Sequence, residues 1–152
     1  MRHDWPTADP IVGLGAVELA QRIRARDLSA AEVTESYIGR IEEVDSDLNA
    51  VVIPLFPEAR EQAAAADRVL KRGDDVGPLH GVPVTIKEQY RVAGTQTTLG
   101  ASRKIGNFYH DEGPLVIKLR DSGAIVLGKT NIIGTLAGWE TDSPVYGRTN
   151  NP

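Results

Sequence analysis

The stretch "GAIVLGKTN", residues 123–131, places four apolar residues in a row before Gly-Lys-Thr-Asn. A short apolar run rich in β-branched residues is typical of a strand that is buried on both faces. The segment before it predicts a helix that begins near Asp111, has Pro114 in its first turn and ends at Gly123. A helix followed by a buried strand indicates an α/β fold, and such folds place their sites at the carboxyl ends of strands.

The same letters match the phosphate-binding pattern GxxxxGK[ST] over residues 123–130. A phosphate loop requires a preceding strand, a glycine-rich turn with inward amides and a helix that opens after the lysine. Here the variable positions 124–127 favour an extended strand, and Gly123 suits a helix C-terminus. A P-loop nucleotide binder therefore remains only as an alternative, and we otherwise expect Lys129 merely to complete a misleading motif.

Composition indicates one folded domain. The chain has 152 residues, of which 41% are hydrophobic and 25% charged. A net charge of -4, with basic residues spread among acidic ones, argues against nucleic acid as a partner. The lack of cysteine excludes disulfides, thiolate metal sites and a thiol nucleophile. With no apolar leader and no run of about 18 apolar residues, we expect no membrane association and a cytoplasmic location.

Apolar periodicity elsewhere predicts helices packed on a mixed sheet. The clearest start signal is Ser29 followed by Glu32, a capping box in which each side chain can satisfy the other's backbone donor. In chain order we expect a helix over 16–26, a helix over 29–45, a strand over 51–53, a helix through 58–72 and a strand over 82–87.

Lys87 is the candidate general base. It follows five residues, 82–86, that a core would accept. A lysine that enters an apolar interior must be paired or lose its charge, because desolvation lowers its pKa. The alternatives remain open: a strand-end lysine can reach solvent or pair with the adjacent Glu88. His80 is interpreted as structural, since it lacks the companions of a triad or metal site.

Three segments resemble the amidase signature family, serine hydrolases with a Ser, cis-Ser, Lys triad. They are "LHGVPVTIKEQYRVAGTQTTLGAS" at 79–102, "GPLVIKLRDSGAIVLGKTN" at 113–131 and "TDSPVYGRTNNP" at 141–152. The resemblance implies an α/β fold with a mixed sheet covered by helices, of which this chain supplies the N-terminal portion. It also implies hydrolysis of a small-molecule amide, with no cofactor and no metal.

Carried over by position, the family's catalytic lysine corresponds to Lys87, because this lysine alone follows Gly-Val-Pro-Val-Thr-Ile. The resemblance implies that it is neutral when it works and takes a proton from the nucleophilic serine through the cis-Ser hydroxyl. It further implies that Leu136, Ala137 and Gly138 line the acyl pocket, although a purely structural loop is an alternative.

Two departures from the family pattern leave the substrate open. Glu88 and Gln89 stand where members commonly have Asp and Asn, and the Lys-Glu pair resembles the fatty acid amide hydrolase branch. Gly134 and Thr135 replace a frequent Glu-Phe pair.

The sequence reaches Pro152 before the Gly/Ser-rich segment that carries the serines in the family. We therefore expect a single incomplete domain over 1–152, with helices and a first strand in 1–75 and the lysine strand, helix, strand and substrate loop in 76–152. The expected partner is the C-terminal remainder that bears the serines; a homo-oligomer, an inactive truncated chain and an interaction module stay open. Apolar surface on 82–86 and 124–127 is expected to lack part of its cover.

Overall fold

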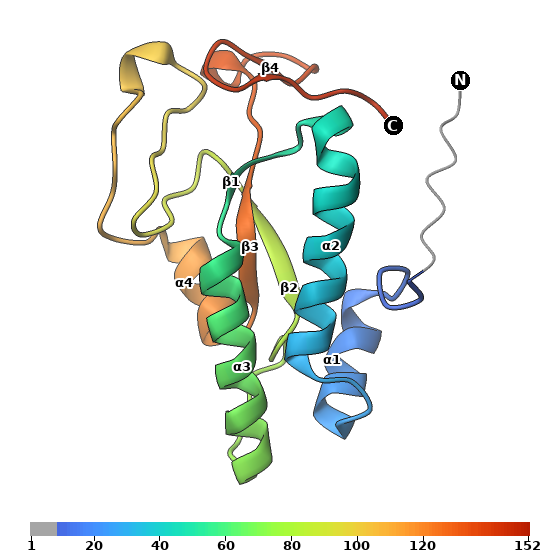
Figure 1. The fold of residues 1–152 in the computed structure, drawn as a ribbon. Coiled ribbons are helices and arrows are strands. Elements are labelled where there is room, and N and C mark those ends of the chain that lie inside the picture. Colours follow the sequence, from blue (N-terminus) through green and yellow to red (C-terminus); the bar gives the residue numbers. More distant parts are fainter. Residues whose placement is uncertain (1–8) are drawn as a thin grey trace.

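The computed structural model describes residues 9–152, so the first eight residues of the domain predicted over 1–152 lie outside the described part. Helices and short strands follow one another along this part (Figure 1). The elements are α1 (Ala16–Ala25), α2 (Ala30–Leu48), β1 (Val51–Pro54), α3 (Phe56–Arg72), β2 (Pro83–Lys87), η1 (Ser102–Lys104), α4 (Pro114–Asp121), β3 (Ile125–Thr130), η2 (Gly134–Leu136), β4 (Asp142–Ser143) and β5 (Gly147–Arg148).

The main sheet has the order β1-β3-β2, with β3 in the centre (Figure 1). Strand β3 runs parallel to β2 and antiparallel to β1. This mixed sheet with covering helices confirms the α/β fold that the sequence predicts. The small β4-β5 pair forms a separate two-stranded sheet.

Strand β3 is buried on both faces, as its unbroken apolar run predicts. Ile125 and Leu127 pack with α1, α2 and α3 in one core cluster. Val126 lies in a second cluster with Val116 of α4 and Ile86 of β2. The expectation that residues 124–127 lack part of their cover is therefore wrong, because helices α1 to α3 on one face and α4 on the other already enclose them. Residues 82 and 86 are buried too, whereas Thr85 between them is exposed.

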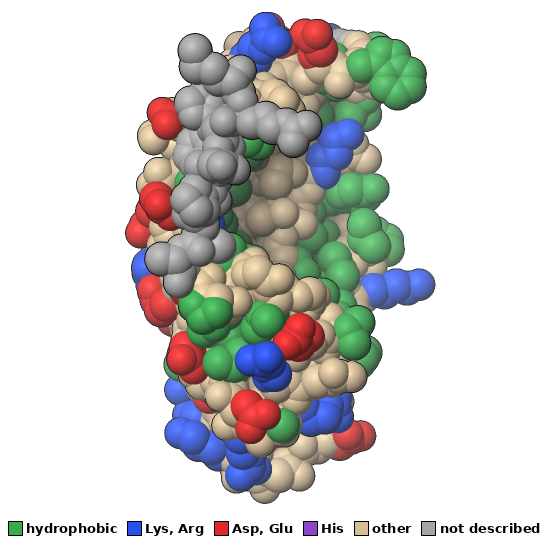
Figure 2. Space-filling view, turned by 90° about the vertical axis from the view of Figure 1, so that its right-hand side faces the viewer, with side chains coloured by type: hydrophobic (Ala, Val, Ile, Leu, Met, Phe, Trp, Pro, Cys, Tyr) green, Lys and Arg blue, Asp and Glu red, His purple; other side chains and the backbone are tan. Residues whose placement is uncertain are grey.

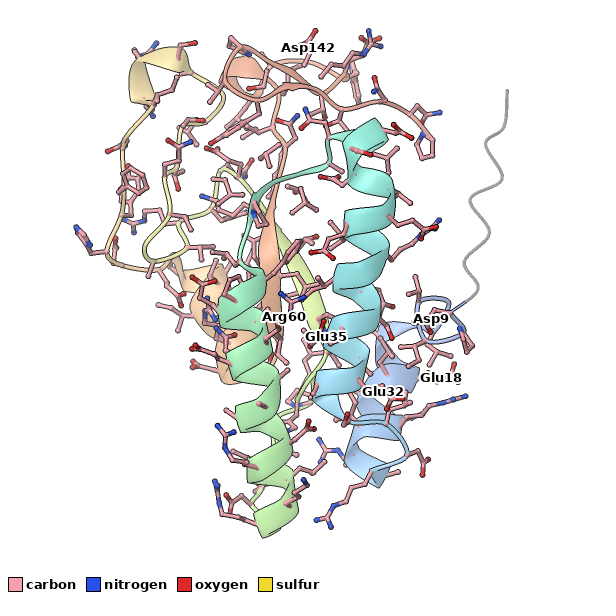
Figure 3. All side chains as sticks on the ribbon, viewed as in Figure 1. Asp9, Glu18, Glu32, Glu35, Arg60 and Asp142 are labelled. Atoms are coloured by element: carbon pink, nitrogen blue, oxygen red, sulfur yellow. The ribbon has the colours of Figure 1, made fainter. Side chains whose placement is uncertain are left out.

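Helix α2 begins where the capping signal predicts, and the serine half of the predicted capping box is present: Ser29 Oγ accepts from Glu32 N at 3.0 Å. A second cap comes from α3, where the Asp67 carboxylate accepts from Ala30 N at 2.7 Å and Ala31 N at 3.1 Å. On the outer surface Arg60 of α3 forms an ion pair with Glu35 of α2 at 2.7 Å (Figure 3). These contacts align the two helices that cover one face of the sheet.

Apolar side chains remain exposed away from the sheet faces, and Figure 2 shows hydrophobic groups gathered along one side of the molecule beside a hollow. No helix within residues 9–152 is long and apolar enough to cross a membrane. The exposed large residues are Val17, Ile105, Phe108, Leu115, Ile117, Leu136 and Trp139.

Strand β1 approaches β3 closely at Gly128. A Cβ added there would lie 2.7 Å from the carbonyl oxygen of Ile53, so Gly128→Ala must push β1 away from the central strand. We expect it to lower the free energy of unfolding of the full-length protein by about 1–3 kcal/mol, as overpacking does.

The matched control is Gly39→Ala on the exposed side of α2, where nothing lies within 4 Å of an added Cβ. This substitution should raise stability by about 0.5–1 kcal/mol, because glycine weakens helix interiors. Denaturant unfolding measures both variants. Equal stability of Gly128→Ala and the parent protein would contradict the close approach of the two strands.

Candidate active site

The parallel strands β2 and β3 end side by side, and the candidate site lies at their carboxyl ends. Lys87 is the last residue of β2 and pairs with Thr130, the last residue of β3. One position earlier, Ile86 pairs with Lys129. Because cross-strand partners share a face and successive residues alternate, the two lysines leave the sheet on opposite faces.

Lys87 is exposed, together with Thr85 on the same face of β2. Between them Ile86 points into the core. The apolar strand is expected to bury Lys87, and within the described residues this expectation is wrong. The two-residue period of a strand turns the Lys87 side chain away from the core. Its backbone is nevertheless held firmly by the pairing with β3.

Lys129 is the lysine that the structure buries, with 0% of its surface exposed. Its ammonium group donates to the carbonyl oxygen of Gln96 at 2.6 Å, Thr97 Oγ1 at 2.9 Å and Thr95 Oγ1 at 3.3 Å. Burial lowers the pKa of Lys129 to about 8, and the nearby Glu88 carboxylate opposes this shift. The motif is misleading, but Lys129 does more than complete it, because its ammonium group joins the end of β3 to residues 95–97.

Glu88 is also fully buried, although it directly follows the exposed Lys87. Its carboxylate accepts from the backbone and hydroxyl of Thr98, the latter at 2.7 Å, and from Leu99 N at 3.1 Å. The hydroxyl of Tyr146 donates to it at 2.9 Å. The carboxylate thus turns to the loop after β2, away from the neighbouring lysine considered as its partner.

Tyr146 links this carboxylate to a further polar side chain. Gln96 Nε2 donates to the Tyr146 hydroxyl at 3.0 Å, and Gln96 Oε1 accepts from Gly106 N at 3.1 Å. Burial and the Glu88 carboxylate raise the pKa of Tyr146. A continuous polar network therefore runs from the end of β2 through the loop at 95–99 to the segment between β4 and β5.

The proposed pocket residues lie beyond the end of β3. Leu136 ends η2, and Leu136, Ala137 and Gly138 are all exposed. A Cβ on Gly138 would lie 2.5 Å from Ile133 Cδ1, so this loop folds tightly back on its own start. The structure brings the loop to the same end of the sheet as Lys87 (Figure 1).

Asn131 anchors the following segment to this end of the sheet. Its Nδ2 donates to the carbonyl oxygen of Gly147 at 3.0 Å and to Thr149 Oγ1 at 3.0 Å. The Gly-Lys-Thr-Asn sequence after the apolar run therefore serves two tertiary contacts, one through Lys129 and one through Asn131.

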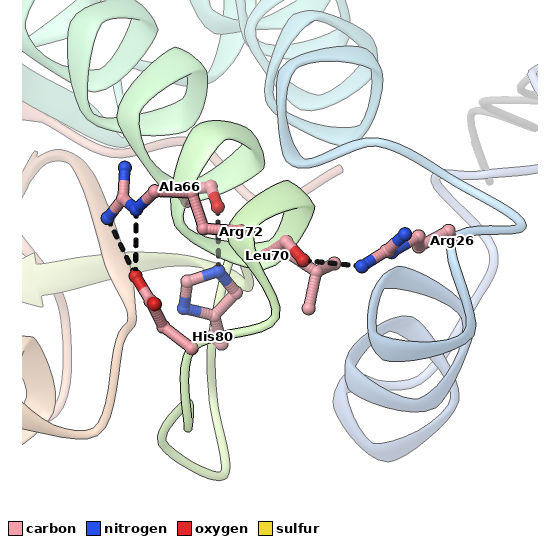
Figure 4. Close-up of polar contacts among 6 residues, drawn as sticks. Arg26, Ala66, Leu70, Arg72 and His80 are labelled. Carbon is pink, nitrogen blue, oxygen red and sulfur yellow. Dashed lines mark hydrogen bonds and ion pairs between the residues drawn. The ribbon is translucent and has the colours of Figure 1, made fainter.

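His80 lies before β2, at the opposite end of the sheet. Its Nε2 is 3.0 Å from the carbonyl oxygen of Ala66 on α3 (Figure 4). Nearby, Arg26 donates to the carbonyl oxygen of Leu70 at 2.6 Å, so both side chains tie neighbouring segments to α3. This contact agrees with a structural interpretation of the histidine.

The P-loop alternative fails on the same geometry. Residues 125–130 form β3, so their amides belong to a strand rather than to a phosphate-binding turn. The ammonium group of Lys129 is directed into the protein, toward Thr95, Gln96 and Thr97.

The network predicts an unusual dependence of stability on pH at Lys129. The folded pKa of about 8 lies below the ordinary value of 10.5, so between these values the unfolded chain binds more protons at this position and stability rises with pH. Relative to Lys129→Met, the full-length protein should gain up to about 1.4 kcal/mol per pH unit in that window.

Denaturant titrations of the two proteins between about pH 7 and 10 measure this difference. All other titrating groups are present in both proteins, so the difference reports on Lys129 and on its interaction with Glu88. A difference that stays flat, or that falls as pH rises, would contradict a desolvated lysine at this position.

Known proteins that are similar to this chain indicate its family. A family model described as Amidase matches residues 32–152. The chain is 38% identical to indoleacetamide hydrolase of Bradyrhizobium diazoefficiens, covering 94% of this chain and 27% of that protein. It is 35% identical to fatty-acid amide hydrolase 2-A of Danio rerio, covering 97% and 29% respectively.

Among solved structures, native peptide amidase from Stenotrophomonas maltophilia superposes with a TM-score of 0.84 at 33% identity, over 93% of this chain and 30% of that one. The chain thus spans less than a third of the length of these three relatives. The match over residues 32–152 and the shared mixed α/β fold confirm the resemblance seen in the sequence: the chain belongs to the amidase family.

Proposed function

We propose that this chain is the lysine-bearing part of an enzyme that hydrolyses a carboxamide C–N bond, with Lys87 as the base. One observation carries the proposal: Lys87 is held by strand pairing at the carboxyl end of β2 while its side chain remains accessible. Lys129, next to the last residue of β3, already donates to three oxygens inside the protein. Accessibility therefore favours Lys87 as the group that exchanges protons with a substrate site.

In the proposed mechanism a neutral Lys87 accepts a proton, through the hydroxyl of a cis-Ser, from the serine that attacks the amide carbonyl carbon. A new C–O bond forms, and the C–N bond breaks as the proton passes from Lys87 to the leaving nitrogen. Water then cleaves the acyl-enzyme and releases the carboxylic acid. We assign both serines to sequence outside this chain, in keeping with the family resemblance.

A working base at neutral pH requires a lysine whose pKa is lowered. Residues 9–152 leave the Lys87 side chain exposed. We propose that the serine-bearing part of the enzyme covers this face of β2 and supplies the desolvation. The proposed single domain over 1–152 is thus one layer of the complete active site, and the amide binds between this layer and the next.

Leu136, Ala137 and Gly138 are the proposed wall of the acyl pocket. Leu136 is 45% exposed, and the adjacent Trp139 is fully exposed, so apolar surface is available at this end of the sheet. Such a surface suits an apolar acyl group. Two of the relatives are named for fatty-acid amides and for peptides, and these two amide classes are the first substrates to test.

Lys87→Ala in the full-length enzyme should reduce the rate of acylation by about 10²–10⁴-fold, the range of general bases, with little change in substrate binding. Lys87→Arg should be nearly as damaging, because arginine keeps the charge but cannot release its proton. The assay follows hydrolysis of a fatty-acyl amide and of a peptide amide.

Lys118→Ala is the matched control, because Lys118 is an exposed lysine on α4. It should leave the rate unchanged. If Lys87→Arg retained most of the activity of the parent enzyme, Lys87 could not be the base.

A further inference from the structure

Two fully buried charged side chains, Glu88 and Lys129, have no part in the proposed proton transfer. They bind the same loop from two sides. Lys129 Nζ holds residues 95–97 through one carbonyl and two hydroxyl oxygens. The Glu88 carboxylate holds the next two residues through their backbone amides and the Thr98 hydroxyl. The loop is therefore clamped between opposite charges.

The backbone of Glu88 is held beside Lys87 by strand β3. The Glu88 N–H donates to the carbonyl oxygen of Thr130 at 2.9 Å, which extends the pairing of β2 with β3 by one residue. The side chain is fixed by the loop and the backbone is fixed by β3, so the peptide that joins Lys87 to Glu88 has little freedom. Any shift of Glu88 must move the base.

The clamped loop in turn supports the proposed pocket. Leu99 and Gly100 adopt positive φ values of 54° and 67°. The chain therefore turns sharply at the end of the loop that Glu88 binds. At Gly100 an added Cβ would lie 2.7 Å from the carbonyl oxygen of Ile133 and 2.8 Å from Gly134 Cα. The turn is thus pressed against the first residues of the segment that leads to Leu136.

We propose that Glu88 and Lys129 are a pair of positioning residues that keep Lys87 and the pocket loop at 136–138 in a fixed relative geometry. The inference rests on the proposed role of Lys87 as base. Neither side chain reaches the substrate, since both are buried beneath the loop. They act on catalysis indirectly: they fix the end of β2, which carries Lys87, and they fix the turn at Gly100, which contacts the segment leading to Leu136.

The charges themselves matter to this arrangement. A buried carboxylate that accepts several hydrogen bonds, and a buried ammonium that donates three, leave few alternative geometries for the loop. Replacing one member by a neutral side chain leaves the other charge buried without its counter-charge. The two substitutions should therefore be coupled rather than additive.

The test uses the full-length enzyme and an acyl 4-nitroanilide, whose cleavage releases 4-nitroaniline, with Glu88→Gln, Lys129→Met and the double variant. Misplacement of a base by about 1 Å can cost about 10²-fold in rate, so each single variant should lower kcat by about 10–100-fold with KM changed less than about threefold. The double variant should lose less than the product of the two single losses.

Denaturant unfolding of each variant shows whether it is folded at the assay temperature. A purely structural network would lower stability and leave kcat of the folded enzyme unchanged, and that result would overturn the inference. Glu61→Gln, an exposed acid on α3, is the matched control and should behave as the parent enzyme.

Tyr146→Phe replaces Glu88→Gln in the test if Glu88→Gln fails to fold. It keeps the buried Glu88 carboxylate and removes one hydroxyl that donates to it at 2.9 Å. A fall of about 3–10-fold in kcat supports the inference, and an unchanged kcat overturns it. Lys87→Arg in the same series separates the two proposals. If Lys87→Arg is inactive while Glu88→Gln and Lys129→Met keep full kcat, only the positioning role fails; if Lys87→Arg is active, the role of Lys87 itself fails.

Discussion

The burial of β3 on both faces is the constraint on which the rest of this structure depends. A strand with helices on both sides can satisfy its backbone donors and acceptors only through neighbouring strands. Here β1 and β2 supply those partners, one antiparallel and one parallel. The parallel pairing sets the ends of β2 and β3 side by side, and it thereby creates the place where Lys87, Lys129 and the following loops meet.

The polar network follows from that same burial. Strand β3 stays buried past its apolar run and carries Lys129 into the interior, where an ammonium group needs several oxygen partners. The loop at 95–97 provides them, and the Glu88 carboxylate nearby supplies the opposite charge. A lysine that looks incidental in the sequence thus supplies several of the contacts that hold the loop after β2 against the sheet.

The lysines at the ends of β2 and β3 differ in their surroundings. Lys129 is enclosed and fully hydrogen-bonded, whereas Lys87 is fixed at its backbone and open at its side chain. The second arrangement leaves a side chain free to meet a substrate site, as the proposed role of Lys87 requires, and the first suits a rigid frame. The relatives are more than three times as long as this chain.

Sequence by itself determined the α/β class, the order of the α-helices and of the strands of the main sheet, the cap at Ser29 and the family, because these depend on local periodicity and on long ordered motifs. The short β4-β5 pair was not predicted. Only the tertiary structure decided which lysine is buried. That outcome depends on the register of β2 against β3, which skips Leu127, and on partners far away in the chain: Lys129 bonds to residues 95–97, and Glu88 to Tyr146. Desolvation is the sum of all that packs around a group, and no local pattern contains it.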